Sequence, residues 1–307
     1  MGEPPVPRRL DLDDDSDGPT VTWAELYREA RSQLDTAGLD AADVDARRIV
    51  EEASGAEGAS FHDVLAERAT RLGVARFDRM VARRVAGEPL QYVLGRWAFR
   101  TLDLMVDRRV LIPRPETEVV AGVALAELAR RSEPGRVLRA TDLGTGSGAI
   151  GLSLVVERAD TEVILVDIDT GALAVARANT AGLGRVGARV TIREGSWFDA
   201  LDPAEHRRLD LVVSNPPYVA ADEELPDDVR LWEPPHALVP GPTGLEAAQH
   251  ILAEVGEWLS PGGAVVLELA PHQMERAAAL AVAAGLTDVE VSRDLAGRER
   301  VLRARRR

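Results

Sequence analysis

Near the start of the chain, hydrophobic residues recur at helical spacing. The stripe comprises Trp23, Leu26, Tyr27, Ala30 and Leu34. Thr22 and Glu25 have the spacing of a capping box at the start of this helix, and Gly38 can end it. Short helical patterns rich in Ala, Arg and Glu continue to Gly87. We therefore predict a small helical domain over residues 21–88, in which the aromatic side chains belong to the core.

The pattern changes from helical to extended after residue 88. Apolar runs at 102–106 and 110–112 flank a polar step at 107–109. Two extended runs separated by a short polar segment are typical of a β-hairpin. We predict that residues 89–115 form a β-hairpin linker between two domains.

In the remaining part, residues 116–307, strand-like runs alternate with helical stripes. The first five predicted strands along the chain are 136–142, 162–167, 189–193, 209–214 and 264–269. Alternating strands and helices predict a mostly parallel sheet with helices on both faces. The last two runs, 288–292 and 300–303, are joined by a short turn at Gly297. The α/β sheet should therefore end in an antiparallel pair.

Composition narrows the function. The 307 residues carry 51 acidic and 37 basic side chains, a net charge of -14, which disfavours direct binding to nucleic acid or to an anionic membrane. Every basic residue is Arg and there is no Cys, so lysine Schiff bases, thiolate nucleophiles and Fe–S clusters are excluded. No apolar run is long enough to span a membrane, and residues 1–20 have the composition of a disordered acidic tail. We expect a cytoplasmic protein.

A glycine-rich loop connects the first strand of the α/β part to an apolar helix. Gly144, Gly146 and Gly148 let the backbone turn tightly and approach a ligand, which the amide groups of the helix N-terminus can then bind. Asp167 ends the next strand, where its carboxylate can accept hydrogen bonds from a ribose. The loop predicts a nucleoside-containing cofactor. It also fits the dinucleotide pattern through Gly144, Gly146 and Ala149, so NAD, or a turn without a ligand, stays open.

The run Asn215, Pro216, Pro217 and Tyr218 follows the strand at 209–214 and should face the same crevice as Gly144. The Asn215 side-chain oxygen and the Pro216 carbonyl can accept both hydrogens of one NH₂ group, and Tyr218 offers a flat ring. These contacts orient a weakly nucleophilic planar nitrogen toward an electrophile such as a sulfonium methyl group. With the glycine loop about 70 residues upstream, the pattern indicates methyl transfer from S-adenosylmethionine to nitrogen.

Other functions remain as alternatives. Methylation of adenine N6 uses a similar amino group, although it requires a basic groove that the net charge argues against. An NAD-dependent oxidoreductase has no use for the run at 215–218, and a module that only binds a nucleoside would give no methylated product. The five His residues lack metal-ligand spacing, so we expect no metal site.

Over residues 22–303 the chain resembles the release factor glutamine methyltransferases, the PrmC/HemK family. The resemblance rests on the segments 87–95, 110–118, 142–150, 197–198, 214–218, 233–238 and 294–300. It implies a class I (Rossmann-like) S-adenosylmethionine-dependent methyltransferase domain with a seven-stranded sheet, preceded by a helical substrate-docking domain and a hairpin linker. The implied activity is N5-methylation of the glutamine in the Gly-Gly-Gln motif of class I peptide-chain release factors, which modulates translation termination.

The resemblance also implies roles for individual residues. The loop residues that would hold the methionine end of the cofactor are Gly144, Thr145, Gly146, Ser147 and Gly148. Asp167 would bind the ribose, Trp197 would lie near the adenine, and Asn215 would lie beside the cofactor. The substrate glutamine would contact Asn215, Pro216, Pro217 and Tyr218, of which Asn215, Pro216 and Tyr218 would be catalytic. We expect a monomer that contacts the release factor through its helical domain.

Two features refine this interpretation. Sister enzymes methylate a glutamine of a large-subunit ribosomal protein, but they usually lack the Arg-Pro-Glu-Thr-Glu run found here at 114–118, which favours the release-factor branch. Ser196 stands where many members have an acidic residue that contacts the adenine amino group. The adenine contacts of this chain are therefore expected to differ.

Overall fold

The computed structural model describes residues 21–56 and 58–307, and the chain divides into one unit up to Ala86 and a second from Gly87 to Arg307. The predicted acidic tail at residues 1–20 lies outside the described residues. None of the helices in the described ranges combines the length and apolarity needed to cross a bilayer.

The first unit consists of helices around a small core. Its α-helices are α1 (Trp23–Thr36), α2 (Ala42–Ser54), α3 (Phe61–Val64) and α4 (Arg71–Val85), with a 3₁₀ turn at Gly58–Ser60. The capping box at the start of α1 is present, because Thr22 Oγ1 accepts from the Glu25 amide and the Glu25 carboxylate accepts from the Thr22 amide. Trp23 is buried and meets Phe77 of α4 edge to face. Trp23 is thus a core residue, as predicted, whereas Tyr27 is only half-buried and its hydroxyl donates to Asp43 at 2.7 Å.

The second unit opens with α5 (Leu90–Leu94) and a hairpin of β1 (Arg96–Phe99) and β2 (Leu102–Met105). The predicted pairing of 102–106 with 110–112 is wrong, because in the described chain residues 110–112 belong to no strand. The turn lies instead at Arg100, whose φ is +52°. The Arg100 amide donates to Glu118 Oε1 at 2.9 Å, and its guanidinium pairs with Glu157. These distant carboxylates hold a turn that local sequence does not indicate.

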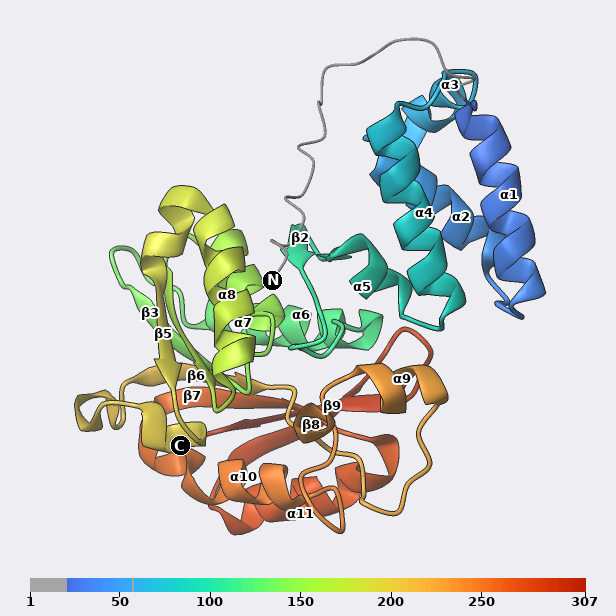
Figure 1. Ribbon diagram of the computed structural model, residues 1–307. Coiled ribbons are helices and arrows are strands. Elements are labelled where there is room, and N and C mark those ends of the chain that lie inside the picture. The colour runs from blue at the N-terminus through green and yellow to red at the C-terminus, as the bar shows by residue number, and fades with distance from the viewer. Residues whose placement is uncertain (1–20, 57) are drawn as a thin grey trace, which may run out of the picture. The chain divides into compact units, whose positions relative to one another are not determined.

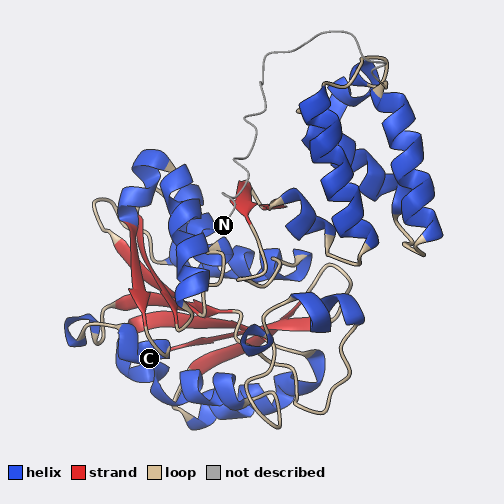
Figure 2. Cartoon of the chain, in the orientation of Figure 1, coloured by secondary structure: helices blue, strands red, loops and turns tan. Residues whose placement is uncertain are grey.

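The larger sheet has the strand order β5-β4-β3-β6-β7-β9-β8 (Figures 1 and 2). Its strands are β3 (Leu138–Leu143), β4 (Thr161–Asp167), β5 (Val190–Glu194), β6 (Leu209–Ser214), β7 (Leu259–Glu268), β8 (Thr287–Arg293) and β9 (Glu299–Arg305). The first five in this order are parallel, while β9 is antiparallel to both β7 and β8. The mostly parallel seven-stranded sheet with an antiparallel end is confirmed.

Helices cover both faces of this sheet and give it two apolar cores (Figure 1). One face packs against α6 (Pro115–Arg130), α7 (Ala149–Glu157) and α8 (Thr170–Gly182), and the other against α10 (Glu246–Trp258) and α11 (Met274–Ala283). The short helix α9 (Asp227–Trp232) and 3₁₀ turns complete the unit; the turns lie at Gly184–Arg189, Trp197–Ala200, Pro203–Glu205, Pro235–Ala237 and Pro271–Gln273. Burial on both faces explains why the central strands read as continuous apolar runs.

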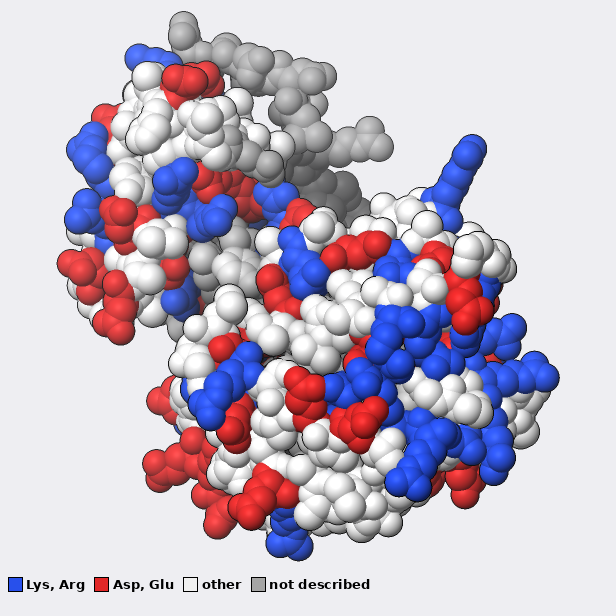
Figure 3. Space-filling model, turned by 180° about the vertical axis from the view of Figure 1, so that it is seen from behind, with Lys and Arg blue, Asp and Glu red and all other residues white. Residues whose placement is uncertain are grey.

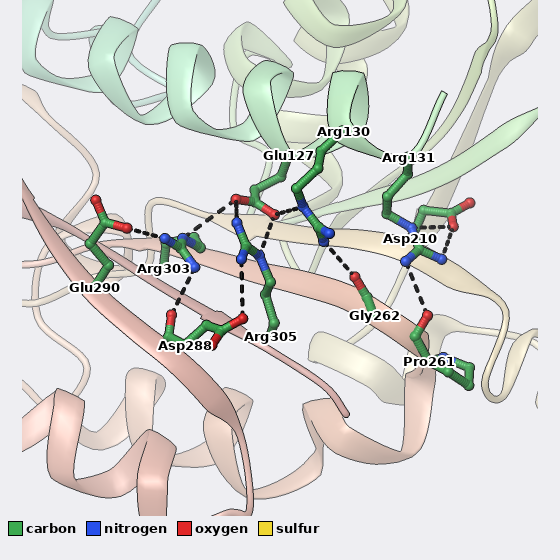
Figure 4. Close-up of polar contacts among 10 residues, drawn as sticks. All are labelled: Glu127, Arg130, Arg131, Asp210, Pro261, Gly262, Asp288, Glu290, Arg303 and Arg305. Atoms are coloured by element: carbon green, nitrogen blue, oxygen red, sulfur yellow. Dashed lines mark hydrogen bonds and ion pairs between the residues drawn. The ribbon is translucent and has the colours of Figure 1, made fainter. Parts of the chain in front are cut away.

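Two buried acids, Asp210 and Glu127, form ion pairs with arginines at the end of the sheet where β6 begins (Figure 4). Asp210 accepts from Arg131 Nε at 2.8 Å and also pairs with Arg136. Glu127 accepts from Arg305 at 2.7 Å and lies close to Arg303. Figure 3 shows acidic and basic side chains interspersed over much of the face it presents, with basic side chains more frequent on one side of the larger unit. The arginines in this cluster are paired with acids rather than arranged as a separate basic surface.

Candidate active site

The glycine-rich loop lies between the end of β3 and the start of α7. Gly144, Gly146 and Gly148 have φ values of +69°, +55° and +88°, in the left-handed region that favours glycine. A buried carboxylate holds this loop, because Asp142 Oδ2 accepts from the Thr145 hydroxyl at 2.7 Å and from the Gly151 amide at 2.9 Å. Burial raises the pKa of Asp142 to about 6, while these two hydrogen bonds act in the opposite direction. The loop is therefore shaped from beneath by the strand that leads into it.

Asp167 ends β4, which is paired with β3, and its carboxylate turns toward the loop. Asp167 Oδ2 accepts from the Gly146 amide at 2.8 Å, and Oδ1 accepts from the Asp169 amide at 3.0 Å. Burial raises the pKa of Asp167, and these backbone amides oppose the shift. Each carboxylate oxygen can accept a second hydrogen bond. Asp167 can thus shape the loop and still receive hydroxyl groups of a ligand.

A cavity of about 470 Å³ opens at the carboxyl ends of these strands. It brings together many of the residues singled out from the sequence: Gly144, Gly146, Asp167, Ser196, Trp197, Asn215 and Pro217. The rest of its lining includes Arg109, Ile168, His236, Glu246 and His250, which sequence reasoning did not select. The volume lies in the range of small-molecule and cofactor sites, and this edge of a parallel sheet is where such sites form.

Several of the selected residues lie behind the cavity wall rather than in it. Thr145 and Ser147 are buried, and the carbonyl of Ser147 accepts from the Asn179 side chain at 2.8 Å. Asn179 also binds both backbone polar groups of Met105, so it links the glycine loop to the hairpin. Both residues can present backbone groups to a ligand, while the Thr145 side chain serves the loop itself through its bond to Asp142.

Trp197 forms one wall of the cavity. It begins the 3₁₀ turn after β5 and has a φ of +47°, which is uncommon for a bulky side chain. A Cβ atom on Gly144 would lie 3.6 Å from the indole ring, so the ring packs directly over the glycine turn. His250 of α10 is the next ring, 6.5 Å away between centroids. Trp197 therefore offers a flat apolar surface beside the loop.

Asn215 directly follows β6, and its position beside the loop is set by the strand end. The Ser214 hydroxyl donates to the Leu143 carbonyl at 2.6 Å, which joins the end of β6 to the end of β3. The Asn215 Nδ2 group donates to Thr117 Oγ1 at 3.3 Å, and the Thr117 hydroxyl donates to Glu268 Oε2 at 2.7 Å. With Nδ2 engaged, the Oδ1 oxygen remains as the acceptor that Asn215 can offer to a ligand.

Tyr218 is half-buried and packs against the apolar core on the α10–α11 face of the sheet. Burial raises its pKa to about 12, and the nearby Glu268 charge acts in the same direction. Its hydroxyl is 3.5 Å from Glu268 Oε1, at the outer limit of hydrogen bonding, and its carbonyl accepts from Gln273 Nε2 at 2.8 Å. The Arg300 guanidinium lies 5.9 Å from the ring centroid. Tyr218 is therefore a neutral, fixed ring.

Sequence reasoning did not assign roles to Thr117 and Glu268, although both are buried and linked to Asn215. Thr117 lies in the 114–118 run, which marked a family but carried no stated chemistry. Glu268 is an acid inside an apolar strand, an unusual placement that could have drawn attention to it. Their pairing joins residues 151 positions apart, which local patterns cannot reveal.

Comparison with known proteins identifies the family. Residues 25–95 match the family model described as the PrmC N-terminal domain, and residues 123–230 match the Methyltransferase small domain. The chain is 40% identical over 284 residues to the release factor glutamine methyltransferase of Cereibacter sphaeroides, covering 92% of this chain and 98% of that protein. The chain belongs to the release factor glutamine methyltransferase family. A relative with the same name from Deinococcus radiodurans is 38% identical over 92% of this chain and 98% of its own.

Family membership also settles the fold and the cofactor. In this member of the release factor glutamine methyltransferase family, the second unit is a class I methyltransferase domain. Its methyl donor is S-adenosylmethionine. The residues around the cavity suit this molecule, since the positive-φ glycines permit close backbone approach and Asp167 retains acceptor capacity.

Proposed function

We propose that this protein methylates the N5 nitrogen of the glutamine in the Gly-Gly-Gln motif of class I peptide-chain release factors. The single observation that carries the proposal is that Asn215 lines the same cavity as the glycine loop and Asp167. An amide acceptor beside a nucleoside-binding loop is the arrangement that methyl transfer to a carboxamide requires. The names of the relatives supply the identity of the protein substrate.

In this proposal the cavity holds the methyl donor. Backbone groups of the loop from Gly144 to Gly148 would hold its methionine end, the Asp167 carboxylate would accept from the ribose hydroxyls, and Trp197 would offer its ring to the adenine. Ser196 also lines the cavity, so a hydroxyl rather than a carboxylate would be available to the adenine edge. The bound donor supplies a sulfonium methyl group, whose positive charge makes its carbon electrophilic.

The substrate glutamine enters beside Asn215. Its NH₂ group donates one hydrogen bond to Asn215 Oδ1 and one to the Pro216 carbonyl, while Pro217 and the Tyr218 ring bound the amide plane. Two acceptors increase electron density on the amide nitrogen and direct its lone pair at the methyl carbon. The nitrogen–carbon bond would form as the sulfur–methyl bond of the donor breaks, which would leave a neutral thioether. Because the amide nitrogen is neutral when it attacks, the transfer would need no strong base, and the extra proton on nitrogen would pass to water.

The helical first unit is proposed to dock the release factor. It covers the predicted docking domain at residues 21–88 except for its last two residues, which belong to the second unit, and the match to the PrmC N-terminal domain supports this role. The predicted linker at 89–115 contains the β1–β2 hairpin. A release factor has more surface than its Gly-Gly-Gln loop, so a second contact can add affinity by multivalent binding.

The test is mass spectrometry of the release factor after incubation with the enzyme and S-adenosylmethionine. We expect one added methyl group on the Gly-Gly-Gln glutamine. Asn215→Ala should lower turnover by about a hundredfold to a thousandfold, while calorimetry should show little change in cofactor affinity. An unmodified release factor, with the methyl group found on a ribosomal protein or on nucleic acid, would contradict the proposed substrate. An Asn215→Ala enzyme with near-normal turnover would contradict the role of Asn215.

A further inference from the structure

We infer that Thr117 and Glu268 are positioning residues that fix which end of the Asn215 amide faces the substrate. This inference rests on the proposed function and adds to it two residues outside the 215–218 run. It concerns a buried chain of hydrogen bonds that starts at β7, passes through α6 and ends beside the cavity.

The orientation of Asn215 matters because its two side-chain ends have opposite hydrogen-bonding properties. The Oδ1 oxygen accepts, as a substrate NH₂ group requires, whereas the Nδ2 group donates and would meet that NH₂ group donor to donor. A rotation of the amide by 180° exchanges the two ends with little change in shape. Asn215 therefore needs a neighbouring group that binds Nδ2 but not Oδ1, so that only one amide orientation is stable.

Thr117 can favour Nδ2 over Oδ1 only while its own hydroxyl hydrogen is donated to another group. A threonine hydroxyl has one hydrogen to donate and lone pairs to accept with. Here the hydrogen is directed to Glu268 Oε2 at 2.7 Å, so only lone pairs remain toward Asn215, 3.3 Å away. A lone pair accepts from Nδ2 and repels Oδ1. The carboxylate thus determines the amide orientation through the hydroxyl.

Burial keeps this chain intact. Thr117 has 4% of its surface exposed and Glu268 has 1%, so water does not compete for their hydrogen bonds. The groups that face Glu268 are Thr117 and Glu116 from α6, Tyr218 after β6 and Arg300 from β9. Glu116 is itself paired with Arg298, and Arg300 makes no ion pair with Glu268 in the described chain. The Thr117 hydroxyl is the closest donor to the carboxylate.

Protonation of Glu268 would remove the discrimination. A carboxylic acid can donate to Thr117 Oγ1, which frees the threonine hydrogen to point at Asn215 and favours the reversed amide. Burial raises the pKa of Glu268 to about 7, with the Thr117 hydrogen bond and Arg300 opposing the shift. Turnover should therefore decline on the acid side of neutrality because the amide loses its fixed orientation.

The experiment compares Thr117→Val, Thr117→Ser and Glu268→Gln with the wild-type full-length enzyme, using release factor and S-adenosylmethionine as substrates. Thr117→Val should lower kcat by about tenfold, the effect of one hydrogen bond, with cofactor affinity unchanged by calorimetry. Thr117→Ser should restore kcat to within about twofold, since the hydroxyl returns. Glu268→Gln should lower kcat and abolish its decline between pH 8 and pH 6, since no carboxylate remains to titrate.

Thr141→Val is the matched control. Its buried hydroxyl donates to the Ile164 carbonyl at 3.1 Å and does not reach Asn215, so kcat should be unchanged even if stability falls. If both Thr117→Val and Glu268→Gln keep the wild-type kcat, this inference is overturned while the proposed function stands. Equal losses in Thr117→Ser and Thr117→Val would also overturn it, because a lost hydroxyl could not explain them. A wild-type enzyme that leaves the release factor unmethylated would overturn the proposed function and this inference together.

Discussion

Gly151, in the first turn of α7, lies where an added side chain would meet the sheet. An ideal Cβ atom built on it would lie 2.2 Å from Leu165 Cδ2 and 3.1 Å from the Asp142 side chain. Leu165 is fully buried on β4, and Asp142 is held by its bonds to Thr145 and Gly151, so neither side chain has free space to move into. Gly151→Ala therefore forces α7 away from the sheet.

The size of the effect follows from the overlap. Carbon atoms pack at about 3.5–4.0 Å, so Leu165 and α7 must separate by roughly 1.5 Å. Overpacking of a tight core costs about 1–3 kcal/mol. Alanine recovers about 0.5–1 kcal/mol relative to glycine inside a helix, and the net destabilisation of Gly151→Ala should be about 1–2 kcal/mol.

Urea unfolding measures this change, with Gly256→Ala as the matched control. Gly256 lies inside α10, and an added Cβ there would have no atom within 4 Å. Gly256→Ala should raise the free energy of unfolding by about 0.5–1 kcal/mol, while Gly151→Ala should lower it. In the double variant with Leu165→Ala, which opens space, the loss should be smaller than the sum of the single losses. A Gly151→Ala protein as stable as Gly256→Ala would refute the reasoning.

Three further predictions test the buried acids and the cavity wall. Burial raises the pKa of Asp142 in the folded protein to about 6, so the stability that its protonated form contributes is fully present below about pH 4 and is lost as the pH rises through 6. Measured by urea unfolding, the stability of Asp142→Asn relative to the wild type should therefore increase by about 3 kcal/mol between pH 4 and pH 8. Asp210→Ala leaves Arg131 buried without its carboxylate and should cost about 3–5 kcal/mol in the same assay. Trp197→Ala removes the ring beside Gly144 and should weaken S-adenosylmethionine binding about tenfold by calorimetry.

The sheet could be predicted from the sequence because its signals are local. The strand at 209–214 was predicted with the bounds that β6 has, since a buried parallel strand is a continuous apolar run. The position of the hairpin was predicted wrongly because its turn contains no Gly, Asn or Pro. Arg100 adopts a positive φ only because Glu118 and Glu157, from two later helices, hold it. Such support comes from tertiary contacts, which a local pattern does not contain.

The candidate site divides in the same way. The glycine loop and the run at 215–218 carry their chemistry in consecutive residues, and the topology rule for parallel sheets is enough to predict that they share a crevice. The Thr117–Glu268 pair has no such signature, because each residue gains its meaning from the other across the fold. Likewise Asn179 is an ordinary helix residue in sequence, yet its side chain connects the hairpin to Ser147.

The acids at the carboxyl ends of β3, β4 and β7 share one property that favours a positively charged ligand. Asp142, Asp167 and Glu268 are stabilised by backbone amides and hydroxyl groups, and within the described residues no arginine lies at ion-pair distance from any of them. At the opposite end of the sheet, Asp210 and Glu127 are each paired with arginines. Amides and hydroxyls stabilise a carboxylate without cancelling its charge. Where these carboxylates are ionised, above the raised pKa values of about 6 for Asp142 and about 7 for Glu268, the cavity end of the sheet keeps a negative field that favours a sulfonium donor over its neutral product.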